Sequence, residues 1–308
     1  MSEERGVQGT QVGGGKPLRW LVTGSGGMLG SDLVAALASC GEDVTGLSRK
    51  ELDVTDEVAV AAAFADARPD VVVNCAAWTA VDDAESHEDR ALAVNGTGAA
   101  HVAAAIAAGC AAPGCRLVHL STDYVFAGDA TVPYAEHDVP GPRTAYGRTK
   151  LAGEQAVRGL LPQAGYVVRT AWLYGAHGPN FVRTMIRLER ERPGVDVVAD
   201  QRGQPTWTAD VARQVIALAG SRAPAGVYHA TSSGVATWFD LAREVFLLLG
   251  ADPDRVRATS TSAFPRPAPR PPYSVLGHDA WATVGLQPIG DWRLSLRSAF
   301  PALLQELR

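Results

Sequence analysis

The chain has 308 residues, of which 46% are hydrophobic and 20% charged, a composition that is typical of a globular protein. Its formal net charge is -5 and its basic residues are dispersed, so it lacks the basic stripe by which proteins bind a nucleic acid. Apolar runs stay below the roughly 20 residues that a membrane helix needs, so neither a nucleic acid nor a membrane is an expected partner.

Residues 1–17 are rich in glycine and polar residues and have no apolar core of signal-peptide length, which predicts a disordered tail. The cysteines stand in apolar surroundings without metal-ligand spacing, and a disulfide framework is unusual at this length. We therefore expect buried, reduced thiols in a cytoplasmic protein. The cysteines are Cys40, Cys75, Cys110 and Cys115.

Short apolar runs that predict strands alternate with stretches of helical spacing as far as residue 169. The predicted strands are Leu18–Thr23, Asp43–Leu47, Asp70–Cys75, Arg116–Ser121 and Gly165–Arg169. The first predicted helix ends near Gly41, and the others cover Asp56–Ala67, Ala91–Gly109 and Thr144–Leu160. Apolar strands separated by helices indicate a parallel sheet covered on both faces, which is a doubly wound α/β fold.

The alternation loosens after Trp172, and the segment Pro265–Pro272 (PRPAPRPP) cannot form a regular helix or a central strand. We therefore expect a dinucleotide-binding domain over 18–171. Residues 172–308 would form mainly a smaller substrate-binding lobe, with some return to the first domain. Ligands of such folds bind at the carboxyl ends of the strands, where a second lobe could close over a cofactor.

Gly24, Gly27 and Gly30 form a GxxGxxG pattern between the first strand and the first helix. Backbone without side chains lets a pyrophosphate approach the helix N-terminus, where free N–H groups and the helix dipole favour an anion. In this context the pattern predicts dinucleotide binding, and a purely structural turn is the alternative.

The residues after the second strand indicate which dinucleotide binds, because an acidic residue there would repel a 2′-phosphate. Ser48, Arg49 and Lys50 favour NADPH, whereas Glu51 and Asp53 lie close enough to leave NADH open.

Tyr146 and Lys150 stand four residues apart on a predicted helix, so their side chains share one face. A neighbouring ammonium favours the phenolate, and we expect it to lower the pKa of the tyrosine. Thr122 ends a strand at the carboxyl edge of the predicted sheet and can bond the same reacting carbonyl. The three residues predict proton donation to a ketone that receives a hydride. The alternative is an ordinary surface helix.

Six segments in one order resemble the dTDP-4-dehydrorhamnose reductase family: LVTGSGGMLG, NCAAWTAVDDAES, LSTDYVF, AYGRTK, RTAWLYG and DQRGQPTWTAD. The resemblance implies a Rossmann fold of the extended short-chain dehydrogenase type. It also implies reduction, with NADPH or NADH, of the C4 ketone of a dTDP-4-dehydro-6-deoxy-L-hexose, such as dTDP-4-dehydro-L-rhamnose. Trp78 and the compositional bias resemble antibiotic-sugar relatives, so dTDP-dihydrostreptose synthase or another deoxysugar 4-ketoreductase is an alternative.

By matching motif, the resemblance makes Thr122, Tyr146 and Lys150 the catalytic residues. The cofactor-binding residues expected are Gly24, Gly27, Met28, Leu29, Gly30, Ser48, Arg49, Asp53, Val54, Ala76, Ala77, Tyr146 and Lys150. The substrate-binding residues expected are Thr79, Val81, Thr122, Asp123, Tyr124, Trp172 and Asn180. For Tyr124 and Trp172, packing between the lobes is the alternative.

Some members of the family dimerise through magnesium bound by glutamates, but no metal motif is matched here. Glu189 and Glu191 are interpreted as solvated helix charges, so we predict no metal, and a homodimer stays open. A dehydratase of the same fold would need an acidic pair beside the tyrosine, where Asp123 stands alone. A non-catalytic NADP-binding regulatory subunit is the rival of another class, and the intact catalytic residues argue against it.

Overall fold

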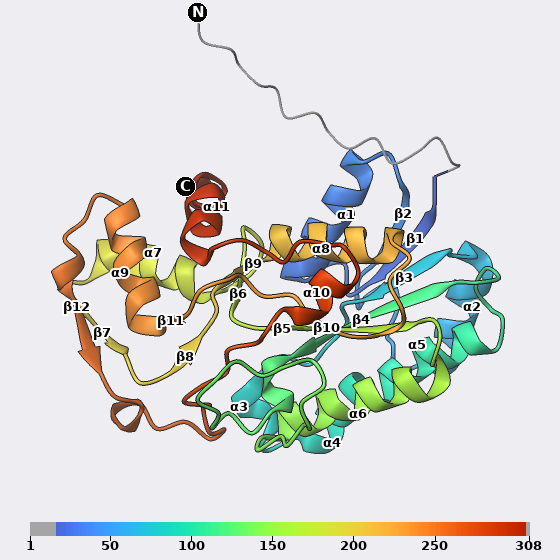
Figure 1. Cartoon of the computed structure of the whole chain (residues 1–308), viewed down its shortest axis with the longest axis horizontal. Coiled ribbons are helices and arrows are strands. Elements are labelled where there is room, and N and C mark those ends of the chain that lie inside the picture. Colours follow the sequence, from blue (N-terminus) through green and yellow to red (C-terminus); the bar gives the residue numbers. More distant parts are fainter. Residues whose placement is uncertain (1–16, 306–308) are drawn as a thin grey trace, which may run out of the picture.

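A six-stranded parallel sheet forms the centre of the computed structural model, which describes residues 17–305 (Figure 1). The strand order is β10-β5-β4-β3-β1-β2. The bounds are β1 Arg19–Thr23, β2 Asp43–Leu47, β3 Val71–Asn74, β4 Arg116–Thr122, β5 Gly165–Thr170 and β10 Gly226–His229. The order turns back at β1, so the sheet is doubly wound, as the sequence predicts.

Helices cover both faces of this sheet (Figure 1). On one face α1 (Met28–Ser39) packs against α8 (Thr208–Gly220). On the other face α5 (Gly98–Ala107) lies between α2 (Glu57–Ala67) and α6 (Ala145–Leu160). Successive strand residues point to opposite faces, and a strand such as Val71–Asn74 is buried on both. This explains the near-continuous apolar strands of the sequence.

The helix predicted over Ala91–Gly109 is present, but it begins earlier, ends at Ala107 and contains a π-helical turn. The structure has α4 (Glu88–Leu92), a π-helical turn (Ala93–Thr97) and then α5. Asn95, Gly96 and Gly98 are weak helix formers, which allows the turn to widen here.

A second hydrophobic core lies beside the sheet, at the left of Figure 1, and comes mainly from the C-terminal part of the chain. Its elements include α7 Phe181–Glu191, β7 Val195–Val198, α9 Trp238–Leu248, β12 Val256–Thr259 and α11 Trp292–Gln305. The other short strands and α-helices of the chain are α3 Val81–Ala84, β6 Leu173–Tyr174, β8 Arg202–Gly203, β9 Thr206–Trp207, β11 Ala236–Thr237 and α10 Asp279–Thr283. Residues Pro265–Pro272 form neither helix nor strand, as predicted.

The cysteines are all free, but they are not all buried. Cys115 is buried and Cys75 and Cys110 are half-buried, whereas Cys40 is exposed at the C-cap of α1, so the expectation of burial is wrong for Cys40. The tail predicted over residues 1–17 lies, apart from Pro17, outside the described residues.

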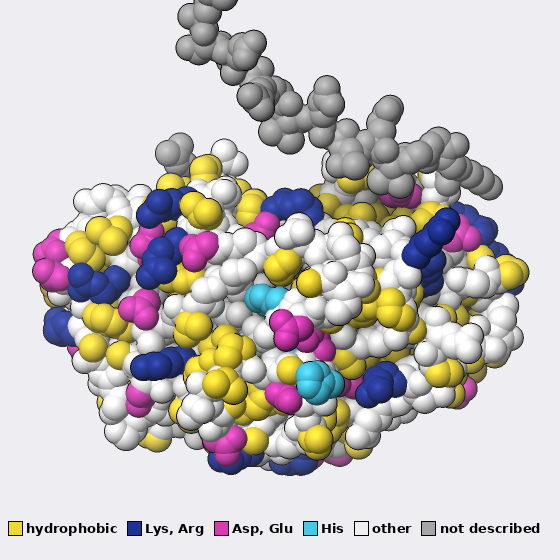
Figure 2. All heavy atoms as spheres, in the orientation of Figure 1, with side chains coloured by type: hydrophobic (Ala, Val, Ile, Leu, Met, Phe, Trp, Pro, Cys, Tyr) yellow, Lys and Arg dark blue, Asp and Glu magenta, His cyan; other side chains and the backbone are white. Residues whose placement is uncertain are grey.

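Acidic and basic side chains are interspersed over the face shown in Figure 2. Among residues 17–305, no helix is both long and apolar enough to cross a membrane. Within the same range, His, Cys, Asp and Glu side chains form no cluster of three that could hold a metal ion.

Candidate active site

The glycine-rich turn leaves the N-terminus of α1 open. Gly24 has φ +65°, and a Cβ there would lie 2.7 Å from the backbone nitrogen of Ala76. A Cβ on Gly30 would come within 2.4 Å of the carbonyl oxygen of Gly24. Gly27 caps α1 without a side-chain hydrogen bond, so the first N–H groups of the helix face outward. Only residues without a Cβ can form this turn, which provides a cradle for an anion.

Met28 and Leu29 follow the glycine-rich turn and differ in how deeply they are buried. Met28 begins α1 and is half-buried, whereas the side chain of Leu29 packs in the core beneath the helix. A contact of Leu29 with a cofactor would therefore use its backbone.

The loop after β2 lies next to the glycine turn, since Ser25 N donates to the carbonyl oxygen of Leu47. Ser48 is half-buried, and its N–H donates to Glu51 at 2.7 Å. Arg49 is 80% exposed and 3.9 Å from Asp53, so its guanidinium is free to turn toward a ligand. Glu51 is thus engaged with its own loop rather than presented as the acidic partner of a ribose.

Asp53 and Val54 make local contacts in the structure, and their contact with a cofactor stays a prediction. The Asp53 carboxylate accepts two hydrogen bonds from Thr55, which hold its pKa below the usual range. The Val54 side chain is buried against Gly98 of α5. The side chain of Val54 therefore contributes to packing between this loop and α5.

The loop after β3 is held by a buried amide that the sequence analysis missed. The Asn95 side chain accepts from Trp78 N at 2.8 Å and donates to Trp78 O at 3.1 Å. It also donates to Thr149 of α6 at 3.1 Å. The segment with Ala76 and Ala77 is therefore tied to the helix that carries Tyr146. The signal available in the sequence was the asparagine–glycine pair inside a helical pattern.

Thr122 stands where β4 ends and a 3₁₀ turn begins. Its hydroxyl donates to the Asp123 carboxylate at 2.9 Å and accepts from Tyr124 N at 3.2 Å. Burial raises the pKa of Asp123 to about 6, and the neighbouring hydroxyls of Ser274 and Thr122 oppose that rise. Asp123 thus acts directly on the hydroxyl of Thr122.

Tyr146 lies on the first turn of α6, buried beside Thr122 and edge-on to the ring of Tyr124, with ring centroids 5.6 Å apart. Burial raises its pKa to about 12, a hydrogen bond with Thr122 opposes the rise, and Asp123 adds to it. The expectation that the ammonium lowers this pKa is wrong here, because burial dominates. Tyr146 is accordingly a neutral phenol at neutral pH, the form that can donate a proton.

Lys150 lies one helical turn further along α6 and is 2% exposed. Its ammonium donates to the carbonyl oxygen of Leu120 in β4 at 2.6 Å. Burial lowers its pKa to about 8, and Glu154 opposes that shift. The structure therefore brings Thr122, Tyr146 and Lys150 together at the junction of β4 and α6.

Beneath them lies a buried ion pair that the sequence analysis missed. Glu154 accepts two hydrogen bonds from Arg169 of β5, at 2.9 and 2.8 Å, and both side chains are 2% exposed. Ser121 donates to the same carboxylate at 2.5 Å. A tertiary pair with no fixed spacing leaves no sequence signal.

The expected substrate residues lie in two groups. Val81 and Tyr124 pack with Trp78 and Tyr146 in one cluster, and Thr79 is exposed at its rim. Trp172 follows β5 and stacks on Trp238. Packing is therefore established for Tyr124 and Trp172, and contact with a substrate stays a prediction.

Asn180 lies apart from these groups, at the N-cap of α7. Its side chain accepts from Arg183 N at 3.0 Å and donates to Gly175 O at 2.8 Å. These hydrogen bonds hold the loop before α7.

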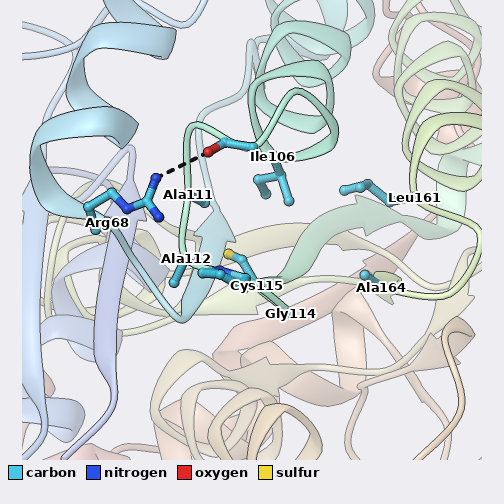
Figure 3. Close-up of a pocket in the computed structure, with 10 residues that line it drawn as sticks. Arg68, Ile106, Ala111, Ala112, Gly114, Cys115, Leu161 and Ala164 are labelled. Atoms are coloured by element: carbon cyan, nitrogen blue, oxygen red, sulfur yellow. Dashed lines mark hydrogen bonds between the residues drawn. The ribbon is translucent and has the colours of Figure 1, made fainter.

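A hollow of about 420 Å³ lies elsewhere (Figure 3). Its lining includes Arg68, Ile106, Cys115, Leu161 and Ala164. Arg68, Cys115 and Ala164 precede strands, so the hollow is at the amino edge of the sheet, opposite the glycine turn. Apart from the Arg68 guanidinium, which donates to Gly109 O, the labelled side chains are apolar or a thiol. This hollow has no part in the candidate site.

The parallel sheet, its glycine-rich first turn and the Thr–Tyr–Lys arrangement define the class of Rossmann-fold proteins of the short-chain dehydrogenase type. A family model described as the RmlD substrate binding domain matches residues 18–305, and the chain belongs to this family. The match confirms the family resemblance noted in the sequence.

Individual relatives cover nearly the whole chain. A dTDP-4-dehydrorhamnose reductase of Streptomyces griseus is 57% identical over 92% of this chain and 94% of the relative. A probable dTDP-4,6-dihydroxy-2-methyloxan-3-one 4-ketoreductase of Streptomyces antibioticus is 57% identical over 93% and 96%. The crystal structure of a dTDP-4-dehydrorhamnose reductase of Bacillus anthracis in complex with NADP is 37% identical, with a TM-score of 0.88 over 93% of this chain and 99% of that chain.

Proposed function

We propose that the protein reduces the C4 ketone of a dTDP-4-dehydro-6-deoxy-L-hexose with NADPH. The observation that carries this proposal is the burial of Tyr146 on the first turn of α6, close to Thr122 at the carboxyl end of β4 and one helical turn before Lys150. The family and its named relatives support the substrate class.

The cradle at Gly24 and Gly30 fits a dinucleotide pyrophosphate, because any side chain there would occupy the space of the backbone. When bound, NADPH would supply the hydride. The exposed guanidinium of Arg49 would hold the 2′-phosphate, and Lys150 would hold the nicotinamide ribose. The other expected cofactor residues remain proposals with them.

In the reduction, the C4 carbon gains a hydride and the ketone oxygen gains a proton, so a secondary alcohol forms. Tyr146 would donate that proton, and Thr122 would hydrogen-bond the developing oxyanion. In the structure the Thr122 hydroxyl donates its hydrogen to Asp123, so it would turn that hydrogen to the ketone oxygen when it stabilises the oxyanion. Residues 172–308 would mainly hold the sugar nucleotide, with Trp172 as a contact, and a homodimer stays a prediction.

A related 4-ketoreduction of an antibiotic deoxysugar is the second candidate. The observation that favours it is the equal identity, 57%, to the ketoreductase of S. antibioticus and to the reductase of S. griseus. The catalytic arrangement would be the same, and the ring stereochemistry would differ.

The test mixes the protein with NADPH and enzymatically generated dTDP-4-dehydro-L-rhamnose, follows the loss of reduced-nicotinamide absorbance and identifies the product sugar. Formation of dTDP-L-rhamnose would support the first candidate. Turnover of an antibiotic-pathway 4-keto sugar alone would favour the second, and NADPH binding without turnover of either would favour a non-catalytic role.

Tyr146→Phe provides the internal control for this assay. It should retain NADPH binding and lose about 100-fold or more in kcat, the scale of losing a positioned proton donor. Near-normal turnover of this variant would refute the assigned donor.

A further inference from the structure

Trp172 has a backbone conformation that tryptophan rarely adopts. Its φ is +47°, in the left-handed region that disfavours a residue with a Cβ. It follows two residues after Thr170, which pairs with Thr122 in the register of β5 and β4. Trp172 therefore leaves the sheet at the edge that carries Thr122. A strained residue at such a place persists only when its surroundings hold it there.

The surroundings of the Trp172 indole come from the C-terminal part of the chain. The ring stacks on Trp238, with centroids 3.7 Å apart and planes at 8°. The backbone of Gly203 also lies against it, and an added Cβ there would come within 2.5 Å of the indole atom Cε2. Gly203 and Trp238 together form what we call the indole slot.

The short antiparallel sheet of β8 and β11 builds the indole slot. Gly203 pairs with Ala236, and Trp238 follows two residues later as the first residue of α9. Thr237 caps α9 in a capping box, which fixes where the helix begins. The indole nitrogen of Trp238 donates to Gln201 at 3.0 Å, which fixes the ring in its plane. The positions of Gly203 and Trp238 are thus fixed by contacts that do not involve Trp172.

We propose that Gly203 and Trp238 are positioning residues that set the affinity for the sugar nucleotide by holding Trp172 in one orientation. This inference rests on the proposed function, in which Trp172 contacts the sugar nucleotide. Gly203 and Trp238 act through Trp172 and need not touch the substrate. Aromatic contacts depend on ring orientation, so an indole that turns in its site loses them while the proton donor stays in place.

The first measurement compares Trp238→Leu and Gly203→Ala with the wild-type protein. Each variant should raise the KM for the dTDP-4-keto sugar about 10-fold, with kcat within about 3-fold and the Kd for NADPH unchanged. Trp238→Phe keeps a stacking ring without the hydrogen bond to Gln201, and it should restore most of the affinity. An unchanged KM in folded Trp238→Leu and Gly203→Ala would overturn the proposal.

Two control variants make the same chemical changes outside the slot, one on β9, which pairs with β6 directly after Trp172, and one at the end of α8. Trp207→Leu removes a half-buried indole of the same region that packs with Arg213, 5.3 Å from the ring centroid. Gly220→Ala adds a Cβ where no atom lies within 4 Å. Both should keep the wild-type KM, and an equal rise in Trp207→Leu would show a general loosening that overturns the proposal.

A double-mutant cycle separates action through Trp172 from direct contact. In a Trp172→Ala background, Trp238→Leu should raise KM no further, because its partner is already gone. Additive effects would overturn the proposal and leave the proposed function intact. If Trp238→Leu does not fold, Gly203→Ala in the same background carries the cycle. No turnover by the wild-type protein would overturn the proposed function and this inference with it.

Discussion

Replacing Glu154 by glutamine tests how strongly the buried ion pair under the active site stabilises the fold. The substitution keeps the shape of the side chain but leaves Arg169, 2% exposed, without its counter-ion. Removing one partner of a buried pair costs about 3–5 kcal/mol of unfolding free energy. With an unfolding entropy of about 2.1 cal/mol/K per residue over 308 residues, Tm should fall by about 5–8 °C.

The matched control is Glu88→Gln, because Glu88 also forms two hydrogen bonds with an arginine, Arg148, at 2.8 and 2.6 Å. Both side chains of that pair are about half exposed, at 44% and 45%, so its loss should cost about 0–1 kcal/mol. Calorimetry of the two variants at the same pH and salt measures the difference. Equal Tm shifts would refute the reasoning that burial, and not hydrogen-bond geometry, determines how much an ion pair contributes to the free energy of unfolding.

Three further predictions concern the cradle, the cofactor preference and pH. Gly30→Ala places a Cβ 2.4 Å from Gly24 O, so a fluorescence titration should show NADPH affinity reduced about 10-fold or more, and unchanged affinity would contradict the cradle. Arg49→Asp should shift the ratio of kcat/KM for NADPH and NADH toward NADH, whereas a constant ratio would show that another residue holds the 2′-phosphate. Burial raises the pKa of Asp123 to about 6 from 3.8, so the folded protein prefers the protonated acid and loses this stabilisation as pH rises through about 4–6. Asp123→Asn should therefore reduce the pH dependence of the free energy of urea unfolding in that window. An unaltered pH dependence would show that other groups cause it.

The elements that are defined by a residue pattern over a few positions could be predicted from the sequence. The strand Asp43–Leu47 is found with the predicted bounds, and α6 begins directly after Thr144, which caps it. Both depend on patterns within a few residues: apolar runs, helical spacing and a capping side chain. The glycine turn was accessible because its glycines form a local pattern, although the backbone that excludes a Cβ at Gly24 belongs to Cys75 and Ala76 after β3.

The elements that depend on distant partners could not be predicted. β10 (Gly226–His229) joins the edge of the central sheet from a region where the alternation had loosened, and its position follows from pairing with β5. Asn95 acts on Trp78 and on α6 from a π-helical turn that periodicity does not reveal.

The sequence by itself indicated the doubly wound class, the glycine-rich turn and the shared helix face of Tyr146 and Lys150, because alternation of elements and residue spacing are local patterns. Tertiary structure alone decided the pKa of Tyr146, which burial raises, and the orientation of Trp172, which the indole slot holds. Burial and ring contacts are properties of what surrounds a residue in space, and the spacing of residues along the chain does not encode them.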